Sequence, residues 1–204
     1  MPRISDARQR LMDAAQNLIW ESSYGATSVD DICAKADVRK GSFYHFFKSK
    51  SDLEVAALEE DWQYKKARYN DIFSPTVPPL QRIEGFFDFA YERQSQFQRK
   101  LGFVLGCPYC AVGSEMSTQE EGIRSKVQEI FAKVVKYFES AIRDAHAQGL
   151  VHAPDAASKA KLLFAYFHGA MSQARIENDL EMVRGMKTGA FELLGAALPE
   201  PAST

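Results

Sequence analysis

The hydrophobic positions of this chain recur with a helical period over most of its length. Apolar residues fall three or four positions apart in one segment after another, and no segment sustains the apolar–polar alternation of a half-buried strand. Glycine, proline and capping residues separate the segments. The pattern predicts an all-α fold of about nine helices, over residues 5–22, 28–36, 39–47, 51–72, 80–97, 117–148, 155–175 and 179–197, with a short or kinked helix within the glycine-rich residues 98–115. Residues 199–204 are expected to form a disordered tail.

The segment Thr27–Leu53 combines two short helices with a dense set of basic and aromatic residues. Thr27 or Ser28 is expected to cap the first helix, and Asp37 lies in the turn that ends it. In the second helix, Phe43 and Phe47 lie four positions apart and are expected to face inward with Val38. The outward positions are Lys40, Ser42, Tyr44 and His45, whose side chains can reach phosphates and base edges.

This segment resembles the signature of TetR/AcrR-type transcriptional regulators over about residues 5–53. The motif reads GATSVDDICAKADVRKGSFYHFFKSKSDL, and it departs from the family pattern at Cys33, Asp37, Phe43 and Phe46. The resemblance implies a helix-turn-helix DNA-binding domain, residues 1–50, followed by an effector-binding and dimerisation domain, residues 51–204. It implies that Arg39, Lys40, Ser42 and His45 lie nearest the bases, and that Thr27, Ser28, Tyr44, Lys48 and Lys50 hold phosphates. Gly41, between them, completes the candidate DNA-binding residues. The alternative interpretation of this segment is a basic, aromatic helical hairpin that has no binding partner.

Charge distribution is compatible with this interpretation. The net charge of the 204 residues is -2, but residues 1–50 hold eight Lys or Arg against six Asp or Glu, whereas the remainder holds 17 against 21. A mildly basic head on an acidic body permits contact with nucleic acid. The N-terminal residues lack the apolar core of a secretion signal, and no apolar run approaches the ~20 residues that span a bilayer. We therefore expect a cytoplasmic protein that does not contact membranes.

Aromatic residues are the candidate contacts for a small-molecule effector. In the resembling family, the helices that carry them surround one cavity. Many aromatics on helical stripes are simply core residues, but their density favours an apolar, aromatic or thiol-reactive ligand. The candidate ligand-binding residues are Trp62, Phe86, Phe89, Phe103, Cys107, Tyr109, Cys110, Phe131, Phe138 and Tyr166. His168, Gln173 and Arg175 are candidates for additional polar contacts.

The run Cys107-Pro108-Tyr109-Cys110 has the spacing of a redox motif. No strand precedes it, so the context of a thioredoxin-like enzyme is missing. The run instead resembles a subgroup of TetR-type proteins with the pattern G-C-P-x-G-x-L-x-x-E, which Gly106, Cys107, Pro108 and Glu115 match. Three hypotheses stay open for the thiols: small apolar packing, a thiol sensor, or a metal site with His146, His152 or His168.

The last two helices, within residues 155–197, carry more apolar surface than one core needs. In the resembling family such helices form a four-helix homodimer interface. Together these features predict a non-enzymatic regulator without cofactor or metal, most simply a repressor released from a palindromic double-stranded DNA operator by an effector. The alternatives are a thiol redox enzyme that uses Cys107 and Cys110, and a helical dimer that binds proteins.

Overall fold

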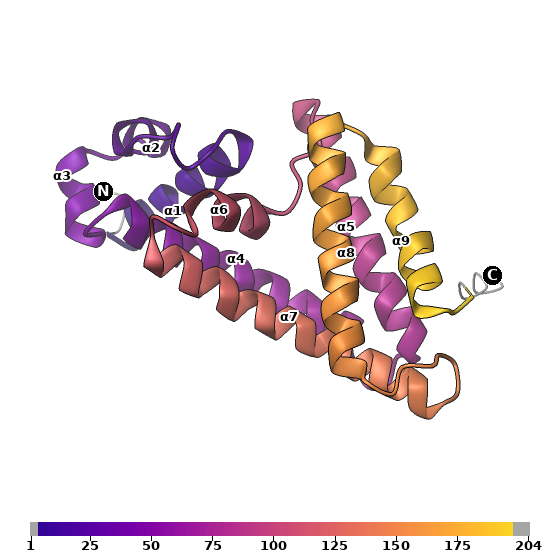
Figure 1. Cartoon of the computed structure of the whole chain (residues 1–204). Coiled ribbons are helices and arrows are strands. Elements are labelled where there is room, and N and C mark those ends of the chain that lie inside the picture. The colour runs from indigo at the N-terminus through magenta and orange to yellow at the C-terminus, as the bar shows by residue number, and fades with distance from the viewer. Residues whose placement is uncertain (1–3, 198–204) are drawn as a thin grey trace. The chain divides into compact units, whose positions relative to one another are not determined.

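The computed structural model describes residues 4–197, and within that range every regular element is an α-helix. This confirms the predicted all-α fold class (Figure 1). The helices are α1 (Ile4–Glu21), α2 (Val29–Ala36), α3 (Lys40–Phe46), α4 (Lys50–Ile72), α5 (Pro79–Leu101), α6 (Pro108–Met116), α7 (Glu121–Ala147), α8 (Ala156–Glu177) and α9 (Leu180–Leu194). The predicted tail 199–204 lies outside the described residues. Among those described, no helix is long and apolar enough to cross a membrane.

Several helix bounds differ from the sequence prediction. Helix α5 continues to Leu101 and α6 begins only at Pro108, so the helix expected within residues 98–115 is confined to the second half of that segment. Helix α4 begins at Lys50, one residue before the predicted start, because the Ser49 hydroxyl accepts the backbone N–H of Asp52 and caps the helix. Helix α7 begins at Glu121 instead of residue 117, because the N–H groups of Gln119 and Glu120 both donate to the Met116 carbonyl and finish α6. The acidic run after Ser117 therefore completes one helix before the next begins.

The chain forms two compact units. The first contains the residues up to Lys65 together with Pro108–Ile130, and the second contains Lys66–Cys107 together with the residues from Phe131 onward. Helices α4 and α7 each run through both units. The expected boundary near residue 50 stays a prediction, since these units are defined by packing alone.

The first unit holds the predicted helix-turn-helix. Helices α1, α2 and α3 pack around side chains that are almost fully buried, and α6 packs against α1. Fully buried side chains of this unit include Leu11, Ile32, Phe43, Leu53 and Trp62. Helix α3 therefore has one face fixed to the core, which leaves its other face to solvent.

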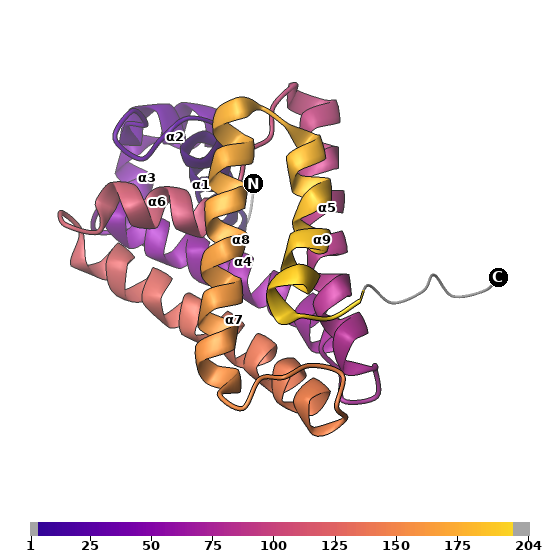
Figure 2. The ribbon, with the colours of Figure 1, turned by 45° about the vertical axis from the view of Figure 1, so that its right-hand side comes forward.

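The second unit is built around aromatic side chains. Helices α5, α8 and α9 run side by side, with α9 packed against both α5 and α8 (Figure 2). The ring of Phe86 lies 4.7 Å from that of Phe138 and 5.0 Å from that of Phe167, both in edge-on arrangements. Phe87 and Phe73 extend this cluster. Aromatic packing therefore supplies much of the core of this unit.

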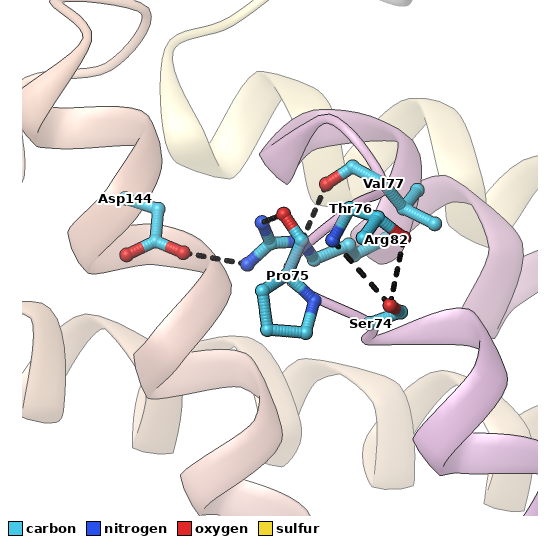
Figure 3. Close-up of polar contacts among 6 residues, drawn as sticks. All are labelled: Ser74, Pro75, Thr76, Val77, Arg82 and Asp144. Atoms are coloured by element: carbon cyan, nitrogen blue, oxygen red, sulfur yellow. Dashed lines mark hydrogen bonds and ion pairs between the residues drawn. The ribbon is translucent and has the colours of Figure 1, made fainter.

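The turn between α4 and α5 is held by one buried arginine (Figure 3). Arg82 donates from Nε to the Val77 carbonyl, from Nη2 to the Pro75 carbonyl and from Nη1 to the Asp144 carboxylate on α7. The prolines at 75, 78 and 79 cannot continue a helical ladder. The guanidinium thus satisfies carbonyls that the broken helix leaves open.

Candidate DNA-binding surface and effector region

Helix α2 is fixed at both ends by short polar side chains. The Ser28 hydroxyl accepts the backbone N–H of Asp31, and the Asp31 carboxylate accepts that of Ser28, which completes a capping box. These hydrogen bonds to Ser28 lower the pKa of Asp31. At the other end, Asp37 lies in the turn, as predicted, and it has a left-handed backbone conformation with φ of 51°. The turn to α3 is therefore set by residues of the motif itself.

Helix α3 separates an apolar face from a polar one. Phe43 and Phe47 are buried, as predicted, and their rings lie 5.9 Å apart. Next to this face, the Tyr44 ring lies 5.1 Å from that of Phe43, and Tyr44 is 55% exposed although it is a large aromatic residue. The predicted contact residues that the structure leaves exposed are Ser28, Arg39, Lys40, Gly41, Ser42, Tyr44, His45 and Lys48. This surface combines positive charge, hydrogen-bonding groups and a flat ring, the chemistry that protein–DNA contacts use.

An acidic residue lies within this polar surface. The Lys40 ammonium is 2.8 Å from one carboxylate oxygen of Asp30, and both side chains are largely exposed. The hydrogen bond to Asp30 raises the pKa of Lys40, so the lysine keeps its positive charge. The pairing reduces the net positive charge that this face presents.

Two of the predicted phosphate contacts have internal partners instead. Thr27 is buried, and its hydroxyl donates to the Ser23 carbonyl. The Lys50 ammonium donates to the carbonyls of Tyr24 and Thr27, at 2.7 and 2.8 Å, and lies 3.9 Å from the centre of the Tyr24 ring. Both side chains organise the turn between α1 and α2, so we leave them out of the proposed DNA surface.

The ten candidate effector residues do not share one environment. Trp62, Tyr109 and Cys110 belong to the first unit, and the other seven to the second. Within the second unit, Phe86 and Phe138 are fully buried core residues, whereas Phe103 is 61% exposed. Phe89 is half-buried beside Tyr69.

Tyr166 has a structural partner in α9. Its hydroxyl donates to the Met186 carbonyl, and its ring fills the space over Gly189. A Cβ atom at residue 189 would collide with that ring. The tyrosine therefore joins α8 to α9.

Phe131 and His168 form the most distinctive pairing in the second unit. The two rings lie 4.4 Å apart, and the His168 ring is 4.2 Å from that of Phe164. Burial lowers the pKa of His168 to about 4, so the imidazole is neutral at pH 7. From the sequence, His168 was a candidate for a polar contact with the effector or for a metal ligand. The spacing of Phe164, Phe167 and His168 on one helical face was the signal for its aromatic surroundings.

No cysteine of the chain forms a disulfide. Cys33 is buried on α2, and burial raises the pKa of its thiol. Cys107 and Cys110 are half-buried, on either side of the start of α6 at Pro108. In the part of the chain that the structure describes, no three His, Cys, Asp or Glu side chains are grouped so as to hold a metal ion. His146 and His152 have rings 5.9 Å apart, and His146 faces the Val151 carbonyl.

Known proteins share both halves of this chain. A family model described as bacterial regulatory proteins, tetR family, matches residues 11–57, and one described as tetracyclin repressor-like, C-terminal domain, matches residues 79–189. The HTH-type transcriptional repressor DhaR of Mycobacterium sp. (strain GP1) is 28% identical over 92% of this chain and 91% of its own. The repressor NemR of Escherichia coli (strain K12) is 27% identical over 86% of this chain and 87% of its own.

Solved structures show the same fold. The reduced form of E. coli NemR superimposes with a TM-score of 0.82 at 23% identity, covering 96% of this chain and 100% of that one. A regulatory protein TetR from Rhodobacter sphaeroides gives a TM-score of 0.81 at 25% identity, covering 92% and 98%. The exposed polar face of α3 is thus set in a fold and a sequence family of DNA-binding regulators, not of thiol oxidoreductases. The chain belongs to the tetR family of bacterial regulatory proteins and is a DNA-binding transcriptional regulator.

Proposed function

We propose that the protein is a repressor that binds a palindromic operator as a two-fold dimer and leaves it when a small molecule binds. The observation that carries the DNA-binding part is the division of α3 into a buried Phe43–Phe47 face and an exposed polar face. A helix presented in this way suits the major groove. Repression is supported by the names of DhaR and NemR, which are called repressors. DNA binding also supports a cytoplasmic location.

The exposed residues of the proposed DNA surface form two groups, one proposed to contact base edges and the other to contact phosphates. Arg39 at the N-cap of α3, together with Lys40, Ser42 and His45 within the helix, is exposed, and these four residues are proposed to contact base edges. Ser28, Tyr44 and Lys48 are proposed to hold phosphates on either side. Gly41 is exposed, and a Cβ atom there would meet nothing within 4 Å, so α3 can approach DNA closely at this residue.

A second copy of this chain is the proposed occupant of the outer face of α8 and α9. Leu162 and Ile176 are exposed on α8, the latter to 83%. Gly169 on α8 and Gly185 on α9 are exposed, and nothing in the chain lies within 4 Å of a Cβ atom at either. Glycine inside a helix costs roughly 0.5–1 kcal/mol relative to alanine, and the chain's own packing does not require it here. Close approach of partner helices would explain both glycines.

The proposed dimer interface is tested by replacing Gly169 and Gly185 with a larger residue. Gly169→Leu and Gly185→Leu should convert the dimer to monomer in sedimentation equilibrium while the helical circular dichroism is retained. Gln128→Leu adds the same side chain to an exposed position on α7 and should leave the dimer intact. A dimer that survives both glycine substitutions would place the interface elsewhere.

The effector is proposed to be an apolar or aromatic small molecule that binds the second unit. Phe131, Phe164 and His168 offer aromatic faces together with a neutral imidazole, which can donate one hydrogen bond and accept another. A thiol-reactive effector acting at Cys107 or Cys110 is the second candidate. It is favoured by the partial exposure of both thiols and by the similarity to NemR, whose solved structure is described as a reduced form.

Two experiments distinguish an aromatic effector from a thiol-reactive one. A panel of uncharged aromatic compounds should release the protein from DNA, and His168→Leu should weaken that release. N-ethylmaleimide should release the protein only if a thiol is the sensor, and Cys107→Ser with Cys110→Ser should then abolish its effect. Release by maleimide that persists in the double serine variant would exclude both thiols.

DNA binding itself is tested by selecting an operator from random sequence. Random double-stranded DNA is selected for binding to the full-length protein, and the enriched sequence is expected to be a palindrome with half-sites a whole number of helical turns apart. Lys40→Ala and Tyr44→Ala should weaken binding to it, and Lys48→Ala, which removes a proposed phosphate contact, should lower the salt slope by about one. Lys66→Ala removes an equal charge from exposed α4 and should change little. Failure to enrich any sequence would exclude the proposal.

A further inference from the structure

The turn between α2 and α3 is also held from outside the motif, by an arginine on α1. Arg10 donates from Nη1 to the Ala36 carbonyl at 2.7 Å and to the Asp37 carbonyl at 3.2 Å. The carbonyls just before these are capped by the backbone N–H groups of Asp37 and Val38. Arg10 therefore satisfies acceptors that the end of a helix leaves open.

The carbonyl contacts, and not the ion pair, are the firm part of this link. The Nη1 atom of Arg10 is also 3.8 Å from the Asp37 carboxylate, but that carboxylate is fully exposed, and an exposed ion pair stabilises little. The next residue on α1, Leu11, is completely buried, so the backbone of α1 is fixed at this point by the core of the first unit. The guanidinium thus reaches the turn from a firmly packed helix.

Asp37 needs such support because of its backbone conformation. Its φ of 51° and ψ of 50° lie in the left-handed region, which is unfavourable for a residue that carries a Cβ atom. Aspartate tolerates this region better than most residues do, but a conformation of this kind persists only where its surroundings hold it. The hydrogen bond from Arg10 to the Asp37 carbonyl supplies part of that support.

Helix α3 begins directly after this turn. Its N-cap residue, Arg39, makes no side-chain capping hydrogen bond, and the helix is seven residues long. Arg39 and Lys40, which are proposed to contact bases, follow Asp37 by two and three positions. A rotation about the backbone of Asp37 would therefore displace the side chains that read bases. Non-specific attraction to phosphates depends mainly on charge and would change less.

We propose that Arg10 is a positioning residue for the reading of DNA sequence: by holding Asp37 in its left-handed conformation, it sets the angle at which α3 meets the bases. The proposal rests on the base contacts proposed above for α3. Arg10 lies on α1 and needs no contact with DNA for this role. Its loss should lower the preference for the operator more than the general affinity for DNA.

The first test measures binding of the full-length protein to the selected operator and to a scrambled duplex of equal length. Arg10→Met should weaken operator binding about tenfold, the effect of about one lost base contact, and should change binding to the scrambled duplex by less than about twofold. Circular dichroism at the assay temperature establishes that each variant is folded. If Arg10→Met weakens binding to both duplexes equally, or to neither, the proposal is wrong.

Two control variants accompany this test. Arg10→Lys keeps the positive charge and a donor for the carbonyls, so it should recover most of the lost operator affinity. Lys66→Met removes an equal charge from an exposed position on α4, and it should leave the preference for the operator unchanged. A loss of preference in Lys66→Met as large as that in Arg10→Met would mean that net charge, and not the turn, is responsible.

The second test changes the turn and keeps the arginine as the variable. Glycine adopts the left-handed conformation without the cost of a Cβ atom, so in an Asp37→Gly background the effect of Arg10→Met should shrink from about tenfold to about threefold or less. Asp37→Asn is the matched control, because it removes the carboxylate charge and keeps the Cβ atom. In that background the effect of Arg10→Met should stay at about tenfold. An equal effect in all three backgrounds would overturn the proposal.

Failure of the proposed DNA surface gives a different result. If the wild-type protein selects no operator, the base contacts proposed for α3 are wrong. If the wild-type protein selects an operator and Arg10→Met prefers it as strongly, only the role of Arg10 is refuted.

Discussion

Arg82 on α5 and Asp144 on α7 form an ion pair in which the arginine is buried and the aspartate is partly exposed. Their Nη1 and Oδ2 atoms are 2.6 Å apart, and the side-chain exposures are 5% and 38% (Figure 3). The guanidinium also holds the carbonyls of Pro75 and Val77. The pair therefore joins α7 to the turn between α4 and α5.

The two partners should contribute unequally to stability. Arg82→Met leaves two carbonyls and a carboxylate without their donor, and should lower the free energy of unfolding by roughly 2–4 kcal/mol. Asp144→Asn keeps an acceptor for the arginine and leaves both carbonyl contacts, so it should cost about 1 kcal/mol or less. Urea unfolding at pH 7 measures both values. Equal losses would mean that the ion pair, and not the turn, is the stabilising contact.

Glu54 predicts an unusual dependence of stability on pH. It is 3% exposed, its Oε2 atom has no hydrogen-bond partner, and burial raises the pKa of its carboxyl to about 7 despite the opposing effect of Lys50. In the unfolded chain the carboxyl titrates near its ordinary value of 4.5. Between pH 4.5 and pH 7 the folded state binds more protons than the unfolded state. The contribution of Glu54 to the free energy of unfolding therefore falls as pH rises through this range, and it stays low above pH 7.

Replacing this carboxyl with a neutral amide should therefore stabilise the protein at alkaline pH. Glu54→Gln should raise the free energy of unfolding by about 2 kcal/mol at pH 8, where the wild-type group must ionise in a buried site. At pH 4, where the carboxyl is protonated in the folded state, the gain should nearly vanish. The measurement is urea unfolding of both proteins at the two pH values. A pH-independent difference would show that ionisation is not the cause.

Local patterns in the sequence predicted the elements of this fold well. Ser28 and Asp31 lie three positions apart and form the capping box, and Asp37 adopts the left-handed conformation in the turn that ends α2. These features depend only on residues within one or two helical turns, so a single sequence contains them. The exposed residues of α3 could be predicted for the same reason. Phe43 and Phe47 face the core, and their positions determine which side of the helix faces solvent.

Contacts between distant segments were not predictable in this way. Lys50 was expected to meet a phosphate, but its long side chain reaches back to two open carbonyls of the α1–α2 turn. Glu115 was singled out by its motif, yet nothing local indicates that its carboxylate accepts the backbone N–H of Gly25, 90 residues away. Helix periodicity does not say which of several nearby charged groups a flexible side chain will meet.

His168 should make the protein sensitive to acid. Burial lowers the pKa of the imidazole to about 4, whereas the unfolded chain titrates near 6.5. The unfolded state therefore binds the proton first as pH falls, and the contribution of this residue to stability is lost between about pH 6.5 and 4. From pH 7 to pH 5 the loss should be roughly 2 kcal/mol. His168→Phe removes the titrating group while keeping an aromatic ring beside Phe131.

The test is the change in unfolding free energy between pH 7 and pH 5. It should be smaller in His168→Phe than in the wild-type protein by roughly the same 2 kcal/mol. Equal changes in the two proteins would show that the imidazole is protonated without penalty in the folded state.

Asp30 should limit the affinity for DNA. Its carboxylate pairs with Lys40 at 2.8 Å on the proposed DNA face, and both side chains are exposed. Asp30→Asn removes a charge that phosphates repel and leaves the Lys40 charge uncompensated. Affinity for the selected DNA at low salt should therefore rise by about threefold or more, and the dependence on salt should become steeper. Titrations at several salt concentrations measure both quantities.

The matched control is Asp13→Asn, which removes an equal charge from the exposed side of α1, where Asp13 accepts a hydrogen bond from Gln9. It should change affinity less than Asp30→Asn does, because net charge alone acts weakly through salt solution. If both substitutions raise affinity equally, overall charge is responsible. If Asp30→Asn weakens binding, the carboxylate instead orients Lys40 for its contact with DNA, because the free lysine would then be more mobile and less well placed.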